Sequence, residues 1–218
     1  GVDIACRMKM TIFDAPPQMV EKNRQHLMDI LQRETRFGIG ASFKNPHDHE
    51  VMAEDWRSSP VTLKCKRTAG NQLGTSGSGN HFVEFGLFDV FEDENALGLP
   101  AGEYAVLVSH SGSRGVGYAI ADYYSKLAME HHPELDKSVK HLAWLDMDSG
   151  AGQEYWQAMN LAGRYAAANH EIIHQRVAKA IGWDVLATVE NHHNFAWEEK
   201  HGGKKVIVHR KGATPAGQ

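Results

Sequence analysis

Four short segments place side chains that bind metals or phosphates among glycines and asparagines. They cover residues 3–6, 77–81, 110–114 and 192–194, and together they supply an Asp, a Cys and at least three His. Carboxylate, thiolate and imidazole can jointly bind divalent transition metals. Because the segments are spread over the chain, the sequence predicts a metal site that is assembled by folding rather than a local finger.

The first segment places Asp3 three residues before Cys6. A carboxylate and a thiolate at this spacing can bind one metal, or the thiolate can bridge two. The alternative is a helix-capping Asp and a buried Cys, since cysteine often behaves as a small hydrophobic residue. In the second segment, glycines over 74–79 would let backbone N–H groups approach a phosphate, while Asn80 offers an amide and His81 an imidazole. A flexible turn is the alternative there.

The third segment follows a short apolar run, so His110 is expected at the C-terminal end of a strand. Arg114 could bind a phosphate through two parallel hydrogen bonds; a serine-rich turn with a surface arginine is the alternative. In the fourth segment, His192 and His193 end another predicted strand, where adjacent side chains point to opposite faces. One of these two histidines is therefore expected to face the site and the other to be structural.

Other polar clusters give weaker predictions. His170 and His174 lie four residues apart on a predicted helix and could form a metal pair, but a core or surface role is favoured. Residues 47–50, although rich in possible ligands, are expected to be solvated. Residues 209–212 join a strand to a glycine turn with two cations, which suits RNA or nucleotide phosphates; an ordinary basic turn fits equally well.

The elements that must position these residues follow from hydrophobic periodicity and from glycine and proline. Residues 38–79 lack sustained periodicity and are expected to form loops and short elements. The predicted helices cover residues 16–37, 116–131 and 153–181, and the predicted strands cover 81–85, 104–108, 185–190 and 205–209.

Composition limits the class of protein. A chain of 218 residues with 42% hydrophobic content can form one large domain, which we favour over two small ones. The net charge of -4 argues against a protein that binds nucleic acid through a generally basic surface, although a local basic cluster can still bind phosphates.

Cys6 and Cys65 are the two cysteines of the chain, which therefore lacks a disulfide framework. This favours a reducing, cytoplasmic setting. The sequence shows neither a long apolar run nor a leader peptide, so a soluble protein is expected. Both ends of the sequence are expected to be truncated.

Six motifs in a fixed order resemble the RtcB-type RNA-splicing ligases. The resemblance spans nearly the whole chain, and six short motifs in the same order make coincidence improbable. The motifs are DxxC at 3–6, GSGNHFxE at 77–84, HSGSRG at 110–115, QAMN at 157–160 on the long helix, HN at 193–194 and HRKGAT at 209–214.

The resemblance implies an α+β fold over residues 1–218, with a β-rich core that carries a metal cleft and with flanking helices. It implies an enzyme that uses GTP and two manganese ions to join an RNA 3′-phosphate or 2′,3′-cyclic phosphate to a 5′-hydroxyl, in tRNA splicing or RNA repair. RNA ends and GTP would be its partners, an activating protein could assist it, and no membrane is involved.

The resemblance also implies a role for each matched metal ligand. Asp3 would bind one metal together with His81, and Cys6 would bridge both metals. His110 and His193 would bind the second metal. Two metals in such a site can neutralise phosphate charge, align an in-line attack and activate a water.

Further roles follow from the same motifs. The guanine-nucleotide pocket would be lined by Asn80, Phe82, Glu84 and Asn194, and Arg114 would hold an RNA phosphate. The family's guanylylated His and a guanine-contacting Lys are expected beyond Gln218, so no His of this chain is assigned that role.

The chain departs from the family pattern at two places. Arg7 stands where the family commonly has Gly, and Asn169-His170 replaces a frequent Asn-Arg pair. Altered RNA contacts are the expected effect. Two other functions stay open at this point: a metal-dependent phosphoesterase that opens RNA cyclic phosphates without ligation, and a non-catalytic protein that binds RNA ends.

Overall fold

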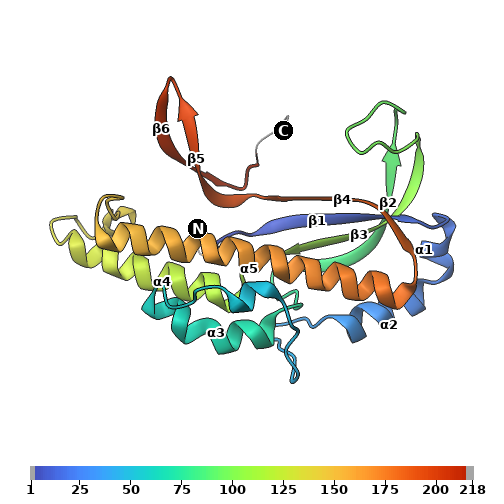
Figure 1. The fold of residues 1–218 in the computed structure, drawn as a ribbon, viewed down its shortest axis with the longest axis horizontal. Helices are drawn as coiled ribbons and strands as arrows, with labels where there is room; N and C mark the ends of the chain where they lie inside the picture. Colours follow the sequence, from blue (N-terminus) through green and yellow to red (C-terminus); the bar gives the residue numbers. More distant parts are fainter. Residues whose placement is uncertain (1–2, 215–218) are drawn as a thin grey trace.

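The computed structural model describes residues 3–214, which form a mixed arrangement of helices and two antiparallel sheets (Figure 1). The larger sheet has the order β2-β3-β1-β4, and its strands are β1 (Arg7–Asp14), β2 (Phe82–Val90), β3 (Gly102–Ser111) and β4 (Asp184–His192). Strands β5 (Asn194–His201) and β6 (Lys204–Lys211) pair with each other as a hairpin that projects from the body in Figure 1. The predicted α+β class is confirmed, with antiparallel sheets. The single domain expected over 1–218 stays a prediction, and residues 1–2 and 215–218, including both chain ends, lie outside the described residues.

Helices cover one face of the larger sheet, with the longest helix, α5, running along it (Figure 1). Among the helices of residues 3–214, none is both long enough and apolar enough to cross a membrane. The α-helices are α1 (Gln18–Lys22), α2 (Arg24–Glu34), α3 (Pro60–Gln72), α4 (Arg114–His131) and α5 (Gly150–Ile181), and the short 3-10 helices are η1 (Glu50–Ala53) and η2 (Lys140–Leu142).

Helix α5 has clear signals at both ends. The side chain of Ser149 accepts a hydrogen bond from the Gly152 N–H at 3.0 Å, which caps the first turn. Gly182 ends the helix in the left-handed conformation, with φ of 70°. Small residues on the buried stripe, including Ala158, Ala162 and Ala166, let neighbouring elements approach closely.

Strand direction explains why distant motifs meet. In an antiparallel sheet the start of one strand lies beside the end of its neighbour. Arg7 at the start of β1 therefore pairs with Ser111 at the end of β3 and with His192 at the end of β4, while Phe82 at the start of β2 pairs with His110. The predicted ligands come from four different parts of the chain and therefore lie at the same end of the sheet, where these strands begin or finish.

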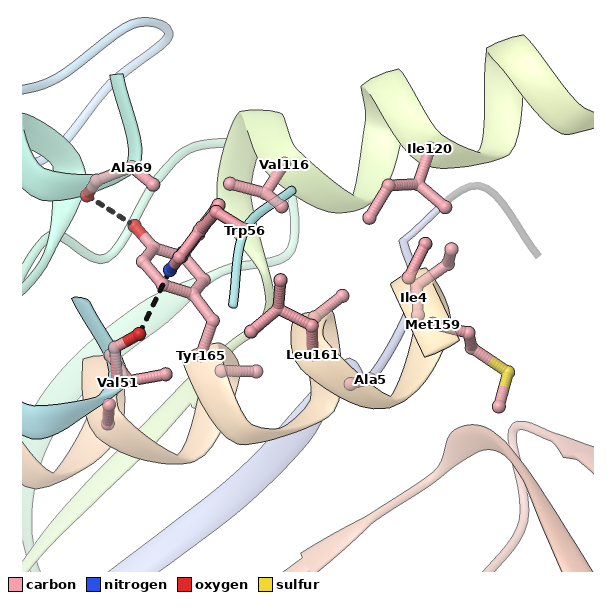
Figure 2. Close-up of a cluster of buried hydrophobic side chains, with 14 of the residues drawn as sticks. Ile4, Ala5, Val51, Trp56, Ala69, Val116, Ile120, Met159, Leu161 and Tyr165 are labelled. Carbon is pink, nitrogen blue, oxygen red and sulfur yellow. Dashed lines mark hydrogen bonds between the residues drawn. The ribbon is translucent and has the colours of Figure 1, made fainter. Parts of the chain in front are cut away.

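The main core lies between α5, α4 and α3 (Figure 2). Trp56 and Tyr165 are almost fully buried there, with rings in edge-to-face contact at 5.9 Å. Each also satisfies its polar atom: the Trp56 indole N–H donates to the Val51 carbonyl at 3.0 Å, and the Tyr165 hydroxyl donates to the Ala69 carbonyl at 2.8 Å. This cluster fixes α5 beneath the edge of the sheet where the motifs meet.

Two predictions about the helices were wrong in detail. The helix expected over residues 16–37 is two helices, α1 and α2, which meet at Asn23 and end by Thr35. Within residues 38–79, where loops and short elements were expected, α3 forms a helix of 13 residues. Its start signal is the Ser59 cap followed by Pro60, but its mostly polar sequence hides the apolar stripe.

Strands β1 and β5 were not predicted, whereas the other four strands and α4 and α5 lie where expected, with ends shifted by a few residues. Residues 209–211 belong to β6 rather than to a turn, and Gly212 follows with φ of 65°. Arg210 forms an ion pair with Glu199 and lies over the Trp197 ring at 5.3 Å. Its charge is therefore already paired within the hairpin.

A chain of buried polar side chains links α5 to the sheet. The Ser109 hydroxyl lies 2.7 Å from Nδ1 of His170 and 2.8 Å from Nε2 of His174, and the Thr11 hydroxyl lies 2.6 Å from Nδ1 of His174. Burial lowers the pKa of His174 to about 3, with a further contribution from Lys9, and burial likewise lowers the pKa of His170. Both histidines are therefore neutral core residues, as the sequence favoured.

This burial predicts a loss of stability in acid. The unfolded chain has a His174 pKa near 6.5 and the folded chain one of about 3, so the unfolded state binds protons more readily. The free energy of unfolding should therefore be highest above the unfolded pKa and fall by about 1.4 kcal/mol per pH unit per histidine as the pH drops toward the folded pKa. Denaturant titrations with a chelator present, from about pH 7 to about pH 4.5, measure this slope. His174→Gln should give a shallower slope, and an unchanged slope would contradict the assignment.

Candidate metal centre

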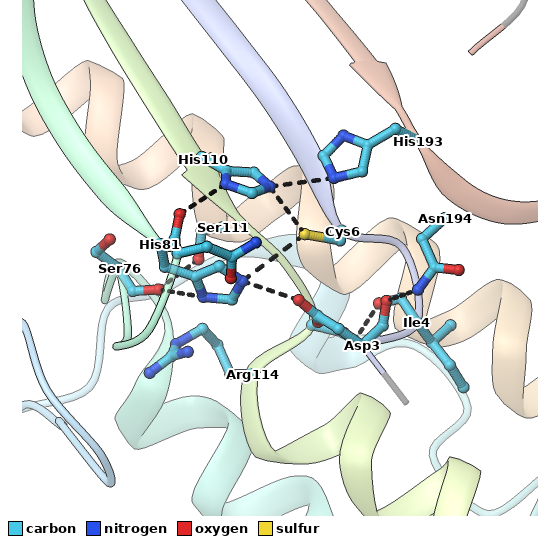
Figure 3. A network of polar contacts seen from close by, with 12 residues as sticks. Asp3, Ile4, Cys6, Ser76, His81, His110, Ser111, Arg114, His193 and Asn194 are labelled. Atoms are coloured by element: carbon cyan, nitrogen blue, oxygen red, sulfur yellow. Dashed lines mark hydrogen bonds and ion pairs between the residues drawn. The ribbon is translucent and has the colours of Figure 1, made fainter. Parts of the chain in front are cut away.

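Five predicted ligands meet at the edge of the larger sheet (Figure 3). Cys6 directly precedes β1, His110 lies near the end of β3, His81 directly precedes β2, and His193 lies between β4 and β5. Asp3 reaches the cluster through a tight turn in which the Cys6 N–H bonds the Asp3 carbonyl at 3.3 Å.

The turn that carries Asp3 and Cys6 is strained. Ala5, fully buried, has φ of 61°, which is unusual for a residue other than glycine. Its N–H is held by the Asn194 carbonyl at 2.9 Å. Such strain persists only where the surroundings enforce it, and it often accompanies functional sites. Here it brings a carboxylate and a thiol to the same side of the turn.

The five side chains form two groups that share one residue. Cys6, His110 and His193 form one group, and Asp3, Cys6 and His81 form the other, with the ligand atoms of each group within 4.8 Å of one another. Within the first group, the Nε2 atom of His110 lies 3.1 Å from the Cys6 sulfur and 3.1 Å from Nε2 of His193. In the second, Nε2 of His81 lies 2.8 Å from an Asp3 oxygen and 3.7 Å from the Cys6 sulfur. Cys6 is thus the one residue common to both groups.

Hydrogen bonds on the outer side of two rings fix which nitrogen faces the cluster. His81 Nδ1 donates to the Ser76 carbonyl at 3.2 Å, and His110 Nδ1 donates to the Asn80 carbonyl at 2.8 Å. A carbonyl can only accept, so in each neutral ring the proton is on Nδ1 and the Nε2 lone pair points inward. This is the usual arrangement around a metal-binding histidine.

The donor set fits metal ions better than it fits a purely polar network. With the Nδ1 proton assigned, the neutral His81 ring would face the Asp3 carboxylate with a lone pair, and His110 would face His193 with another. Electron pairs that converge at these distances call for a cation between them. Carboxylate, thiolate and imidazole suit manganese, zinc and cobalt alike.

Burial sets the charge of the sulfur and the carboxylate. Burial raises the pKa of the Cys6 thiol, and the neighbouring Asp3 charge raises it further, so the metal-free protein holds a neutral thiol at neutral pH. Burial also opposes ionisation of Asp3, but its contacts with His81 and Cys6 and the nearby Arg114 charge outweigh it and lower the Asp3 pKa. A bound cation would stabilise the thiolate and release the proton. For His193, burial and His110 lower the pKa, which favours the neutral, ligating form.

Arg114 lies beside the same cluster (Figure 3). It begins α4 with a positive φ of 55°, and its Nε donates to the Thr75 hydroxyl at 3.0 Å. Gly77 leaves room for the guanidinium, because a Cβ atom at that position would lie 2.1 Å from an Arg114 nitrogen. Burial lowers the pKa of Arg114, but a guanidinium group is not deprotonated in proteins, so the side chain is charged. A cation is therefore held next to the candidate metal ligands.

The four residues predicted to bind a nucleotide lie on two sides of the centre. Phe82 and Glu84 are two apart on β2 and so share one face, where the Phe82 ring lies 5.7 Å from that of His110. Asn80 precedes them and contributes its carbonyl to His110. Asn194 lies on the other side, donates to the Asp3 carbonyl, and lines a largely apolar cavity of about 440 Å³.

The other predicted clusters lie away from the centre. His192 stacks on Phe195 at 4.8 Å, while its neighbour His193 joins the ligands, as the alternation argument predicted. In segment 47–50, Asp48 and Glu50 are exposed as expected, but His47 is half-buried against Phe43. That segment was therefore only in part the solvated loop that the sequence suggested.

The sequence did not reveal the groups that orient the rings. The Ser76 and Asn80 carbonyls are backbone atoms, whose role leaves no trace in the residue type. Ser111 donates to the Ser76 carbonyl at 2.6 Å and lies inside a motif that drew attention for its neighbours His110 and Arg114. Its position directly after the predicted ligand His110 was the available signal.

Comparison with known proteins agrees with this geometry. A family model described as tRNA-splicing ligase RtcB matches residues 1–218. The RNA-splicing ligase RtcB homolog 1 of Entamoeba histolytica is 28% identical, and the match covers 99% of this chain and 50% of that protein. The tRNA-splicing ligase RtcB of Aeropyrum pernix is 32% identical over 90% of this chain and 46% of its own length, and that of Methanocaldococcus jannaschii is 35% identical over 86% of this chain and 22% of its own.

The chain therefore spans about half the length, or less, of these curated relatives. The family model covers every position of the chain, including all six motifs that the sequence singled out. The chain belongs to the RtcB family of tRNA-splicing ligases.

Proposed function

We propose that this chain is part of a GTP- and manganese-dependent RNA ligase, which joins RNA 3′-phosphate or 2′,3′-cyclic phosphate ends to 5′-hydroxyl ends. One observation carries the proposal: two groups of potential metal ligands share the Cys6 sulfur beside the charged Arg114. Family membership supports the reaction type. The need for a free Cys6 thiolate supports a reducing, cytoplasmic setting.

In this proposal Asp3, Cys6 and His81 hold one manganese ion, and Cys6, His110 and His193 hold the second. When bound, the two ions would neutralise phosphate charge and favour in-line attack. The protein's own contribution is orientation: the Ser76 and Asn80 carbonyls keep two imidazole nitrogens directed inward. Arg114 binds a phosphate of the RNA end through its guanidinium. RNA in the form of tRNA halves or broken ends is the proposed substrate.

GTP is proposed to bind beside β2. There Asn80, Phe82 and Glu84 follow one another on the side of His110, and the Phe82 ring offers a surface for a nucleotide. Asn194 is proposed to support the site from the opposite side, through its bond to the Asp3 carbonyl. No histidine of this chain is assigned as the GMP acceptor. An activating protein is proposed as an additional partner of the whole enzyme.

A second candidate function is the metal-dependent opening of RNA cyclic phosphates without ligation. It is favoured by the presence of all five proposed ligands and Arg114 within residues 3–214. Hydrolysis at a metal-activated water needs these groups but no nucleotide-accepting residue.

Product analysis tests the two candidates. An RNA with a 5′-hydroxyl and a 2′,3′-cyclic phosphate is incubated with manganese, GTP and the whole enzyme of which this chain is proposed to be part, and the products are separated on a gel. A sealed circle that requires both GTP and manganese supports the ligase. An opened 3′-phosphate alone supports the phosphoesterase. Binding that persists with the metal chelated, and that weakens only with salt, would instead indicate an RNA-end binding protein.

A further inference from the structure

We propose that Asn169 is a positioning residue, which holds the loop that orients His81 and Arg114. The inference rests on the proposed metal centre and names a residue of α5 that supports it. Asn169 is fully buried in the middle of that helix, where a polar side chain needs partners.

The side chain of Asn169 uses its full hydrogen-bonding capacity on two targets. Its oxygen accepts from the N–H groups of Gly74 at 2.8 Å and Thr75 at 3.2 Å. Its nitrogen donates to the Thr75 carbonyl at 2.9 Å and to the Ser111 hydroxyl at 3.4 Å. An amide has two donors and one acceptor oxygen with two lone pairs, so no other side chain of this size can replace it. Asn169 thus ties the loop after α3 to the end of β3.

That loop carries the groups that orient the site. The Ser76 carbonyl accepts from His81 Nδ1 at 3.2 Å and from the Ser111 hydroxyl at 2.6 Å. The Thr75 hydroxyl accepts from Arg114 Nε at 3.0 Å. Asn169 bonds Gly74 and Thr75 directly, so it holds the residue that contacts Arg114 and the residues next to the one that contacts His81.

Asn169 shares the support of this loop with residues outside α5: the Thr35 hydroxyl donates to the Gly74 carbonyl at 2.7 Å, and the Ser76 N–H donates to the Arg36 carbonyl at 2.9 Å. Gly74 and Gly77 have φ of 85° and 116°, which most residues avoid, so the backbone conformation needs external support. A Cβ atom at Gly74 would lie 2.8 Å from the Ile172 side chain, which shows how closely the loop packs against α5. Hydrogen bonds from Asn169 supply the directional part of this contact.

We expect the two ligand groups to depend on Asn169 to different extents. His81 is oriented through Ser76, one residue beyond the segment that Asn169 bonds. His110 lies within β3, and its Nδ1 is oriented by the Asn80 carbonyl instead. Loss of Asn169 should therefore weaken the group formed by Asp3, Cys6 and His81 more than the group formed by Cys6, His110 and His193.

The proposal is tested by titrating manganese into the metal-free protein and measuring the heat of binding by calorimetry. Wild-type protein should show two binding events. Asn169→Ala should weaken one event by roughly 10- to 100-fold, as is typical when a partner of a metal ligand is lost, and leave the other within about twofold. Adding Asn169→Ala to His81→Ala should cause little further loss in that event, because no His81 ring is left to be oriented, whereas adding His193→Ala to Asn169→Ala should remove the other event as well.

Two further variants separate positioning from general destabilisation. Ser111→Ala removes the hydroxyl between Asn169 and Ser76 without a large change in volume, and should reproduce the selective loss if Asn169→Ala does not fold. Tyr124→Phe removes buried hydrogen bonds to Ser59 and Glu154 elsewhere in the core, and should lower stability without altering either event.

The outcomes distinguish this inference from the proposed function. Two events in the wild type that both weaken equally, or that stay unchanged, in Asn169→Ala and Ser111→Ala would overturn the role of Asn169 alone. Fewer than two events in the wild type would overturn the proposed dinuclear centre and the role of Asn169 with it.

Discussion

Cys6→Ala is expected to abolish tight binding of both manganese ions. Its sulfur is the one ligand atom common to the two groups, lying 3.1 Å from His110 and 3.7 Å from His81. Each site would keep only two of its three protein ligands and would lose its thiolate. We expect each affinity to fall by at least about 100-fold, beyond the 10- to 100-fold typical of losing an outer hydrogen-bond partner. Equilibrium dialysis with elemental analysis measures the number of ions bound per chain.

Cys65→Ala is the matched control for this experiment. Cys65 is the other cysteine, half-buried on α3, and belongs to neither ligand group. The Cys65→Ala variant should bind manganese as the wild type does. Unchanged stoichiometry in Cys6→Ala, or an equal loss in Cys65→Ala, would sink the assignment of Cys6 as a shared ligand.

Gly77→Ala is expected to have the second-largest effect, because it disturbs a metal ligand and the phosphate-binding arginine together. A Cβ atom at this position would lie 2.1 Å from an Arg114 nitrogen and 2.8 Å from Nδ1 of His81. Neither distance is tolerable, so both side chains must move. The φ of 116° adds backbone strain of about 1–3 kcal/mol. Manganese affinity and binding of an RNA 3′-phosphate should each fall by about tenfold or more, a loss of at least about 1.4 kcal/mol in each.

A comparison with Gly79→Ala separates the effect of the steric clash on affinity from the effect of backbone strain. Gly79 also has a positive φ, of 74°, but a Cβ atom there meets nothing within 4 Å. This variant should lose some stability while keeping its affinity for manganese and for the 3′-phosphate. Calorimetry of both variants, beside their thermal unfolding, makes the comparison. Equal losses of affinity in the two variants would show that strain, rather than contact with Arg114 and His81, controls the site.

Much of the candidate site could be predicted from residue types and spacing. Asp3, Cys6, His81, His110 and His193 were selected from the sequence, and the fold brings all five together. Ligands of these types are chemically conspicuous and lie at the ends of apolar strands, where side chains converge. Whether they bind manganese remains a prediction.

Other features of the fold and the site could not be predicted, because they depend on contacts that residue type does not encode. Strand β1 was not predicted, although it is an inner strand of the larger sheet and its pairing with β3 places Cys6 next to His110. Helix α3 was hidden by its polar composition, since a helix on the surface needs only a narrow apolar stripe. Asn169 appeared in the sequence as a variation beside His170, and its four hydrogen bonds became evident only when the loop after α3 was in place.

Diffraction from crystals grown with manganese, measured near the manganese absorption edge, would locate any bound ions. We expect two anomalous peaks on either side of the Cys6 sulfur, one contacted by Asp3 and His81 and the other by His110 and His193. A single peak, or two peaks of which neither contacts Cys6, would contradict a dinuclear centre built on a shared thiolate.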